Sequence, residues 1–148
     1  MYSDGIQSYR RTNVITADPK RLVLICYEGA IDNLRFAKQK IIEKDYEAKG
    51  RALTKAQDIL NELLCSLDFE KGGSIAKNLD ALYNYMSRRI LHADVKKDLS
   101  AIDEVVGMMS ELKSAWEEIF YSKGKGVKTE EIGFDEAQRR QASEYVSL

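Results

Sequence analysis

The chain has 148 residues, with 23 basic and 24 acidic side chains, so its formal net charge is −1. This length suits one domain with a substantial core. A balanced charge disfavours a protein held to nucleic acid by bulk electrostatics. The longest apolar run, Leu22 to Tyr27, is too short to cross a bilayer. The N-terminus lacks the charged start and apolar core of a signal peptide. We therefore expect a cytoplasmic protein without membrane insertion or nucleic-acid binding.

Apolar residues recur at helical spacing in four successive blocks, and nowhere do they alternate as in a strand. Asp18 is suited to cap the first helix, and Pro19 to occupy its first position, whose N–H needs no partner. Gly72 and Gly73 permit a tight turn before the third block. The expected spans are, in chain order, Pro19 to Lys44, the residues after Asp45 to about Leu67, Ser74 to Ala93, and Asp98 or Ser100 to about Phe120.

Short links between the blocks make neighbouring helices antiparallel. The sequence therefore predicts an all-α fold, an antiparallel up-down-up-down four-helix bundle over residues 18–120. Met86 and Trp116 lie on the strongest apolar stripes and should be buried. Residues 1–17 are apolar enough for an N-terminal capping segment. Residues 121–148 begin with a Gly- and Lys-rich linker and are expected to form a flexible tail or a weak, short C-terminal helix.

Catalytic chemistry finds little support in this sequence. The only histidine is His92, and the residue three before it is Arg89, which excludes the Glu-x-x-His pairs of a di-iron bundle. Cys26 and Cys65 are far apart and are interpreted as two buried, reduced core thiols. We expect no enzyme activity, no cofactor and no metal. A histidine phosphotransfer bundle and a structural helical oligomerisation module stay open as alternatives.

One region carries more apolar surface than a bundle helix needs. The run from Leu22 to Tyr27 is apolar on every face for nearly two turns. A locally thick core, the N-terminal segment or a binding partner would each cover it. Tyrosines on the third helix add contact area with a polar tip. The candidate partner-binding residues are Ile6, Tyr9, Leu22, Leu24, Tyr27, Ile31, Tyr83 and Tyr85.

These features resemble the FliS family of flagellar secretion chaperones over about residues 1–120. The resemblance rests on four segments with matching order and spacing, which are Tyr9 with Thr16-Ala17-Asp18-Pro19 and Leu22 to Ala30, Leu67-Asp68-Phe69-Glu70-Lys71-Gly72-Gly73 with Ile75-Ala76 and Asn78-Leu79, Leu82 to Met86 with Arg88-Arg89, and Glu111-Leu112 with Ala115-Trp116. The tail from Tyr121 onward matches no pattern of the family.

The resemblance implies a function as well as a fold. Members of this family bind the disordered C-terminal segment of newly made flagellin in a hydrophobic groove. They prevent its polymerisation in the cytoplasm and aid its export through the flagellar secretion apparatus, a type III export system. An N-terminal segment can occupy the groove in the free protein. A component of the export gate, an anti-sigma factor and a second copy of the chain are further partners that the resemblance implies.

Overall fold

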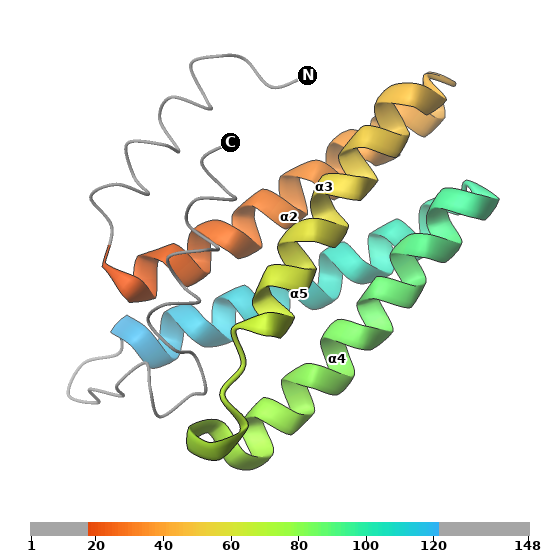
Figure 1. Ribbon diagram of the computed structural model, residues 1–148. Helices are drawn as coiled ribbons and strands as arrows, with labels where there is room; N and C mark the ends of the chain where they lie inside the picture. The colour runs from red at the N-terminus through yellow and green to blue at the C-terminus, as the bar shows by residue number, and fades with distance from the viewer. Residues whose placement is uncertain (1–17, 122–148) are drawn as a thin grey trace.

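The computed structural model describes residues 18–121, and the predictions on residues 1–17 and 122–148 lie outside this range. The described chain forms four helices and no strand (Figure 1). With the numbering of Figure 1, the helices are α2 (Pro19–Ile42), α3 (Tyr46–Cys65), α4 (Phe69–Lys96) and α5 (Leu99–Tyr121). The predicted all-α four-helix bundle is confirmed.

Contacts between side chains show how the helices run past one another. Lys38 pairs with Asp103 at 2.8 Å, and Glu28 lies 3.7 Å from the Lys113 ammonium. Because the residue numbers fall along α5 as they rise along α2, the two helices are antiparallel. Both α3 and α5 pack against α2 and against α4. Helices α2 and α4 therefore lie diagonally across the bundle from each other.

An aspartate just before each of the first three helices satisfies the backbone N–H groups of the opening turn. The Asp18 carboxylate accepts a hydrogen bond from the Arg21 N–H at 2.8 Å, as predicted for α2. Asp45 accepts from Ala48 at 3.2 Å at the start of α3. The sequence therefore located the starts of both helices correctly.

The predicted start of the third helix is wrong by one turn. Asp68 accepts hydrogen bonds from the next turn and starts α4 at Phe69, five residues before Ser74. Gly73 then interrupts the helix with φ 52° and ψ −126°, a conformation that favours glycine. The glycines mark a kink inside α4 rather than a turn before it. A short capped turn precedes the kink, and the long part of α4 follows it.

The core contains the inward face of each helix. Met86 is fully buried and Trp116 is 4% exposed, as predicted. Cys26 is also buried, and the loss of hydration raises the pKa of its thiol to about 12. The prediction for Cys65 is wrong, because this residue is exposed. It lies two residues after the buried Leu63, at the end of α3 and on the outer side of its apolar seam.

Three helices meet at a buried network of hydrogen bonds. The hydroxyl oxygens of Tyr27 on α2 and Tyr83 on α4 are 2.5 Å apart, so the contact spans the diagonal of the bundle. The Trp116 indole N–H on α5 donates to the Tyr27 hydroxyl at 2.9 Å. Burial raises the pKa of both tyrosines well above the ordinary range. Both hydroxyls are therefore protonated and neutral at physiological pH.

The network predicts unequal effects of two matched substitutions. Tyr27→Phe removes both hydrogen bonds of the network and should destabilise the bundle by about 1–3 kcal/mol. Tyr83→Phe removes one contact while Tyr27 still accepts from Trp116, so its cost should be smaller, about 0.5–1.5 kcal/mol. Urea unfolding followed by circular dichroism measures both values. Equal destabilisation would show that the Trp116 hydrogen bond contributes nothing.

Candidate binding surface

The structure separates the predicted partner-binding residues into three groups. Leu24, Tyr27, Ile31 and Tyr83 are buried, and Leu22 and Tyr85 are half-buried. Ile6 and Tyr9 lie outside the described residues. Among the six described residues, only Tyr85 lies between α4 and α5, where its side chain contacts Glu104. The assignment of these residues to a partner stays a prediction.

Helix α4 presents an apolar line beside its buried seam. Ile75, Leu82 and Tyr85 are separated by seven and three residues, so they share one side of the helix. Helical spacing in the sequence places Ile75 on the buried face of the third block, but the side chain is 46% exposed, two residues after the kink at Gly73. Leu82 and Tyr85 pack partly against the core. One edge of α4 therefore stays accessible.

A matching line runs along α5. Met108, Leu112, Ala115 and Ile119 follow at steps of four, three and four residues. Ala115 is exposed, while the other three are half-buried against the core. Hydrogen bonds from α4 to Glu104 bring the two lines side by side. We call these seven residues the α4–α5 stripe: Ile75, Leu82, Tyr85, Met108, Leu112, Ala115 and Ile119.

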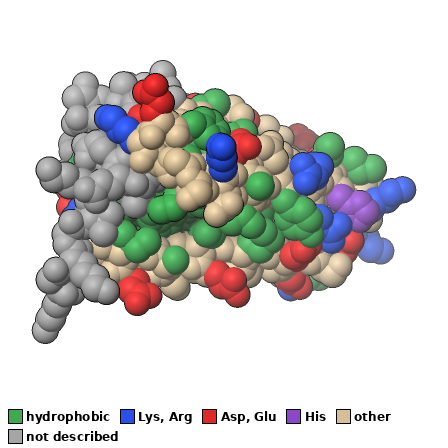
Figure 2. Space-filling model, turned by 90° about the horizontal axis from the view of Figure 1, so that it is seen from below, with side chains coloured by type: hydrophobic (Ala, Val, Ile, Leu, Met, Phe, Trp, Pro, Cys, Tyr) green, Lys and Arg blue, Asp and Glu red, His purple; other side chains and the backbone are tan. Residues whose placement is uncertain are grey.

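Figure 2 looks at the molecule from below and shows hydrophobic side chains gathered along this side of the bundle, with acidic side chains along one edge. Glu104, Glu111 and Glu118 repeat every seven residues on α5 and are exposed. Lys77 and Arg88 are exposed on α4. Apolar groups bordered by charges are typical of a surface that binds another chain.

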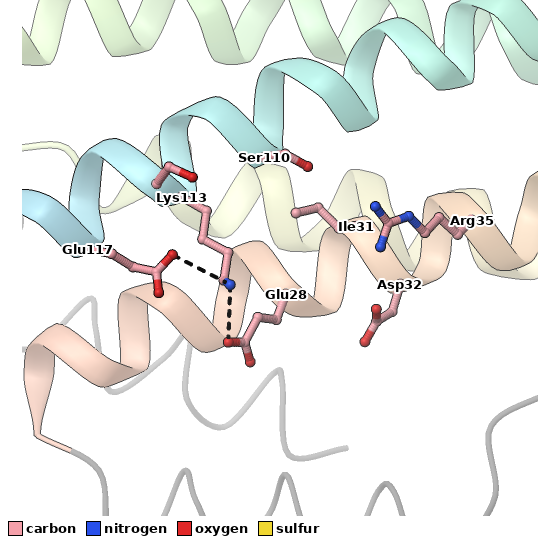
Figure 3. A pocket seen from close by; sticks show the side chains of 8 residues that line it. Glu28, Ile31, Asp32, Arg35, Ser110, Lys113 and Glu117 are labelled. Carbon is pink, nitrogen blue, oxygen red and sulfur yellow. Dashed lines mark ion pairs between the residues drawn. The ribbon is translucent and has the colours of Figure 1, made fainter.

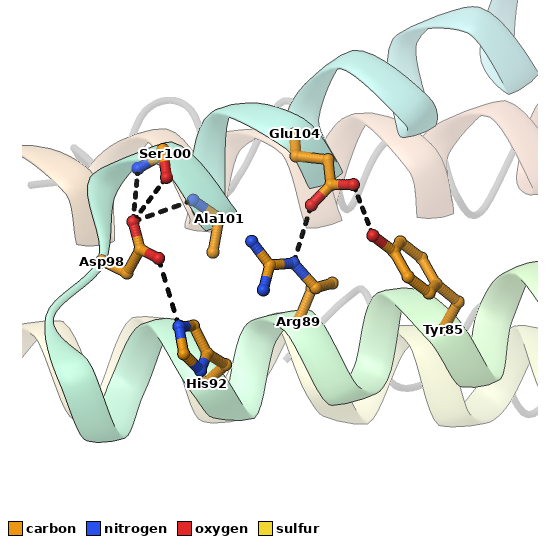
Figure 4. A network of polar contacts seen from close by, with 7 residues as sticks. All are labelled: Tyr85, Arg89, His92, Asp98, Ser100, Ala101 and Glu104. Atoms are coloured by element: carbon orange, nitrogen blue, oxygen red, sulfur yellow. Dashed lines mark hydrogen bonds and ion pairs between the residues drawn. The ribbon is translucent and has the colours of Figure 1, made fainter.

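A polar network closes one end of the stripe (Figure 4). The Tyr85 hydroxyl donates to one oxygen of Glu104 at 2.5 Å, and the Arg89 guanidinium donates to the other at 2.7 Å. The hydrogen bonds from Tyr85 and Arg89 lower the pKa of Glu104 below its ordinary value of 4.5. The hydrogen bond between Tyr85 and Glu104 also raises the pKa of Tyr85. The charged carboxylate thus joins α4 to α5 at neutral pH.

His92 belongs to the same junction. Its Nε2 lies 3.2 Å from Asp98 Oδ2. The other oxygen of Asp98 accepts from the N–H and hydroxyl groups of Ser100 and from the N–H of Ala101, which caps α5 (Figure 4). The hydrogen bond from the Ser100 hydroxyl is the largest cause of the lowered pKa of Asp98. In this arrangement the imidazole contacts the residue that starts the next helix.

A polar hollow of about 450 Å³ lies between α2 and α5 (Figure 3). Lys113 lies between Glu28 and Glu117, at 3.7 and 3.6 Å, and Asp32 and Arg35 line the hollow further along α2. The predicted residue Ile31 also lines this hollow and is only 6% exposed. Charged groups surround its small apolar surface, so the α4–α5 stripe offers the better site for an apolar segment.

The sequence contained a signal for the stripe on the fourth helix. Met108, Leu112, Ala115 and Ile119 form a second apolar line beside the core line of the fourth helix. Two adjacent lines make an apolar arc wider than one neighbouring helix covers. Such an arc indicates either a thicker core or an exposed binding surface. The sequence pattern alone does not distinguish these two outcomes.

None of the helices between residues 18 and 121 combines the length and apolar character that a membrane crossing needs. Over the same range, no three side chains of His, Cys, Asp or Glu group closely enough to hold a metal ion. A helical bundle with an apolar stripe between two of its helices has the architecture of a protein that binds an amphipathic segment of another chain. The described part of the fold thus presents a candidate binding surface.

Comparison with known proteins identifies the family. The family of flagellar protein FliS matches residues 2–123. The flagellar secretion chaperone FliS of Salmonella typhimurium is 42% identical over 80% of this chain and 93% of its own length. The FliS chaperone of Vibrio cholerae is 37% identical over 78% and 88%. That of Bacillus subtilis is 34% identical over 80% and 87%. The chain belongs to the FliS family, which consists of flagellar secretion chaperones and not of enzymes.

The depressed pKa of Glu104 predicts a pH-dependent link between α4 and α5. Because the folded state favours the carboxylate, its stabilising contribution is complete above the ordinary pKa and is lost as the pH falls through the lower, folded-state value. Glu104→Gln should lower the melting temperature at pH 7. The difference from the unmodified protein should close as the pH falls below the lowered pKa of Glu104, as measured by circular dichroism.

Glu111→Gln, seven residues later on the same edge, is the matched control and should change the melting temperature much less at any pH. A Glu104→Gln deficit that stays constant from neutral to acid pH would contradict the prediction, since it would not follow the charge of the carboxylate.

Proposed function

We propose that this chaperone binds the C-terminal segment of flagellin in the cytoplasm, prevents its premature polymerisation and delivers it to the flagellar secretion apparatus. The observation that carries the proposal is the α4–α5 stripe, seven accessible apolar side chains on two neighbouring helices of a member of the FliS family. The half-buried side chains of the stripe already have fixed positions against the core. A partner segment that folds on binding therefore meets a surface that needs little rearrangement.

The stripe has the chemistry to hold an amphipathic segment. An extended or disordered chain loses conformational entropy when it is ordered, so it needs several apolar anchors to bind. Seven apolar residues on two antiparallel helices supply such anchors, and helix-in-groove binding uses this arrangement. The charged edges restrict how a partner can lie without burying a charge. The exposed apolar pair Leu91 and Val95, by contrast, comes from a single helix.

The other partners that the resemblance implies are proposals of lower rank. An export-gate component, an anti-sigma factor and a second copy of the chain each need a surface that stays open when flagellin is bound. Leu91 is 59% exposed and Val95 is 67% exposed, and they follow each other by one turn on α4. This pair lies away from the side of α4 that faces α5 and is therefore a suitable place to test for such contacts.

Substitutions on the stripe should weaken flagellin binding. Ile75→Glu with Ala115→Glu places two charges where the partner's apolar side chains would be buried, on residues that are already exposed. Losing the burial of one large apolar side chain corresponds to about 2 kcal/mol, so affinity should fall by at least about tenfold. Calorimetric titration with the flagellin C-terminal segment measures the effect and should show a negative heat-capacity change for the unmodified protein.

The matched control is Leu91→Glu with Val95→Glu, two equally exposed apolar residues on the other side of α4. This variant carries the same added charge but places it away from the stripe. Its affinity should therefore stay within about twofold of the unmodified protein. Equal loss in both variants would indicate that charge or stability, and not the stripe, controls binding. Steep weakening by salt would point to electrostatic recognition.

The N-terminal segment provides a second prediction about flagellin binding. Ile6 and Tyr9 lie three residues apart in the sequence and were predicted to cover the apolar start of the first helix. Deleting residues 1–12 should leave the bundle folded. It should tighten flagellin binding if the segment only competes, and weaken binding if Tyr9 also contacts flagellin. Unchanged affinity in the same titration would show that the segment does not take part.

A further inference from the structure

The α4–α5 stripe has two charged borders of opposite sign. On α5, Glu104, Glu111 and Glu118 follow the apolar line at steps of seven residues, and acidic side chains line one edge of the hydrophobic surface in Figure 2. The only basic residue of α5 is Lys113, which lies on the α2 side of the helix beside Glu28. The border of the stripe on α5 is therefore acidic.

The border on α4 carries the opposite charge. Lys77 and Arg88 are exposed and eleven residues apart, so they lie within about 20° of each other around the helix. The Arg88 guanidinium lies 6.0 Å from the centre of the Tyr85 ring, which places its charge beside the stripe. Asp80 is the only acidic residue between the kink of α4 and Asp94, and both aspartates lie on the side that contacts α3. The α4 border is therefore basic.

The carboxylates of α5 differ in whether the bundle itself neutralises them. On the side toward α2, Asp103 pairs with Lys38 at 2.8 Å, and Glu117 lies 3.6 Å from a lysine of its own helix. Glu111 and Glu118, which border the stripe, are exposed and form no ion pair within the described part of the chain. Their charges are therefore available to a partner that covers the neighbouring apolar side chains.

The spacing of these two carboxylates fits a second helix. Glu111 and Glu118 are seven residues apart, about 10.5 Å along α5, which equals about two turns of a partner helix. Basic side chains seven residues apart on one flank of that helix would meet both carboxylates. Flanking charges in coiled coils act in the same way, at the edge of an apolar seam. Pairs at such an edge determine orientation and register more than they determine affinity.

Helix dipoles give an incoming helix no preferred direction on this surface. Tyr85 contacts Glu104, and His92, further along α4, contacts the earlier Asp98, so α4 and α5 are antiparallel. Their dipoles therefore oppose each other beneath the stripe. Turning a helix end to end in a groove exchanges its two flanks. Borders of opposite sign thus accept a helix with oppositely charged flanks in one direction only.

We propose that the α4–α5 stripe receives an amphipathic helix with basic side chains on the flank next to α5, and that Glu111 and Glu118 determine the direction in which this helix lies. Apolar contacts supply most of the affinity, and the acidic border selects the flank. The proposal defines the occupant by its chemistry, and its extension to the C-terminal segment of flagellin rests on the proposed function.

Two designed peptides of identical composition test the direction. Each is an amphipathic helix of about eighteen residues, long enough to cover the stripe, with a nitroxide label at its N-terminus. One carries lysine on the right flank of its leucine face and glutamate on the left, and the other has the two flanks exchanged. Met108 and Ile119 lie about 16 Å apart on α5, so their methyl signals in the full-length protein distinguish the two ends of the stripe.

The labels of the two peptides should broaden opposite ends of the stripe. One peptide should broaden Met108 more than Ile119, and its counterpart should do the reverse. Broadening of the same end by both peptides would overturn the proposal, since the flanks would then have no influence on direction. Absence of binding by both peptides would overturn it as well, because the stripe would then not receive an amphipathic helix.

Matched variants of α5 assign the effect to the acidic border. Glu111→Gln with Glu118→Gln should weaken both peptides several-fold, and the difference between the two ends should largely disappear. Asp103→Asn with Glu117→Gln removes the same charge from the α2 side of the same helix. This control should keep the opposite directions and an affinity within about twofold, because exposed ion pairs contribute little to stability. Opposite directions that persist in the first variant would overturn the role of Glu111 and Glu118.

Calorimetric titration of the same two variants with the C-terminal segment of flagellin tests the extension to that partner. The variant at Glu111 and Glu118 should bind several-fold more weakly than the control variant. Equal affinities would show that flagellin does not use the acidic border. If flagellin binds none of these proteins, the proposed function fails, while the directions of the two peptides still decide whether the border orients a helix on the stripe.

Discussion

Tyr27 brings a hydroxyl group into the interior of the bundle, and two other helices must supply its partners. A buried hydroxyl without a hydrogen bond costs more than the bond itself contributes when made. Tyr83 crosses the diagonal from α4, and Trp116 approaches from α5. Apolar contacts tolerate sliding of one helix past another, whereas directional bonds to one oxygen do not. The network therefore constrains the relative positions of α2, α4 and α5.

This constraint connects the interior to the surface. Tyr83 holds α4 toward the core. Two residues later, Tyr85 lies near the surface and contacts α5 through Glu104. The same helix thus contributes to the diagonal contact inside and to the stripe outside. Glu104 then fixes the spacing between α4 and α5 at one end of the stripe. At the other end of the stripe, Ile75 is exposed two residues after the kink at Gly73.

The sequence predicted the fold well because its strongest signals are local. Asp18 and Asp45 start their helices by hydrogen bonds within a single turn, and the seams with Met86 and Trp116 mark the centre of each buried face. The edges of those faces were harder to predict, as Ile75 and Cys65 show. Whether an edge residue is covered depends on the tilt and end of a neighbouring helix, which periodicity does not encode. Tyr27 and Tyr83 were suitable for a binding surface by type, but their mutual hydrogen bond makes them part of the core.

The candidate surface was missed for a related reason. The binding-site prediction was placed on the long apolar run of the first helix, and the second apolar line of the fourth helix was not considered as a binding surface. The fourth helix carries two apolar lines and has only one neighbour on the α4 side to cover them. The spacing between α4 and α5 decides how much of the second line stays accessible. This spacing is set by Tyr85, Arg89 and Glu104, whose pairing over fifteen to nineteen residues has no local signature in the sequence.

The position of Trp116 also gives the protein a built-in optical probe. It is the single tryptophan of the chain, and its indole N–H is bonded to Tyr27 inside the core. Indole emission shifts with the polarity around the ring, and nearby tyrosines transfer excitation energy to it. Its emission spectrum therefore reports on the place where α2, α4 and α5 meet, because no other tryptophan contributes to the signal. Partner binding that leaves this joint intact would leave the emission wavelength unchanged, while a rearranged bundle would shift it without any added dye.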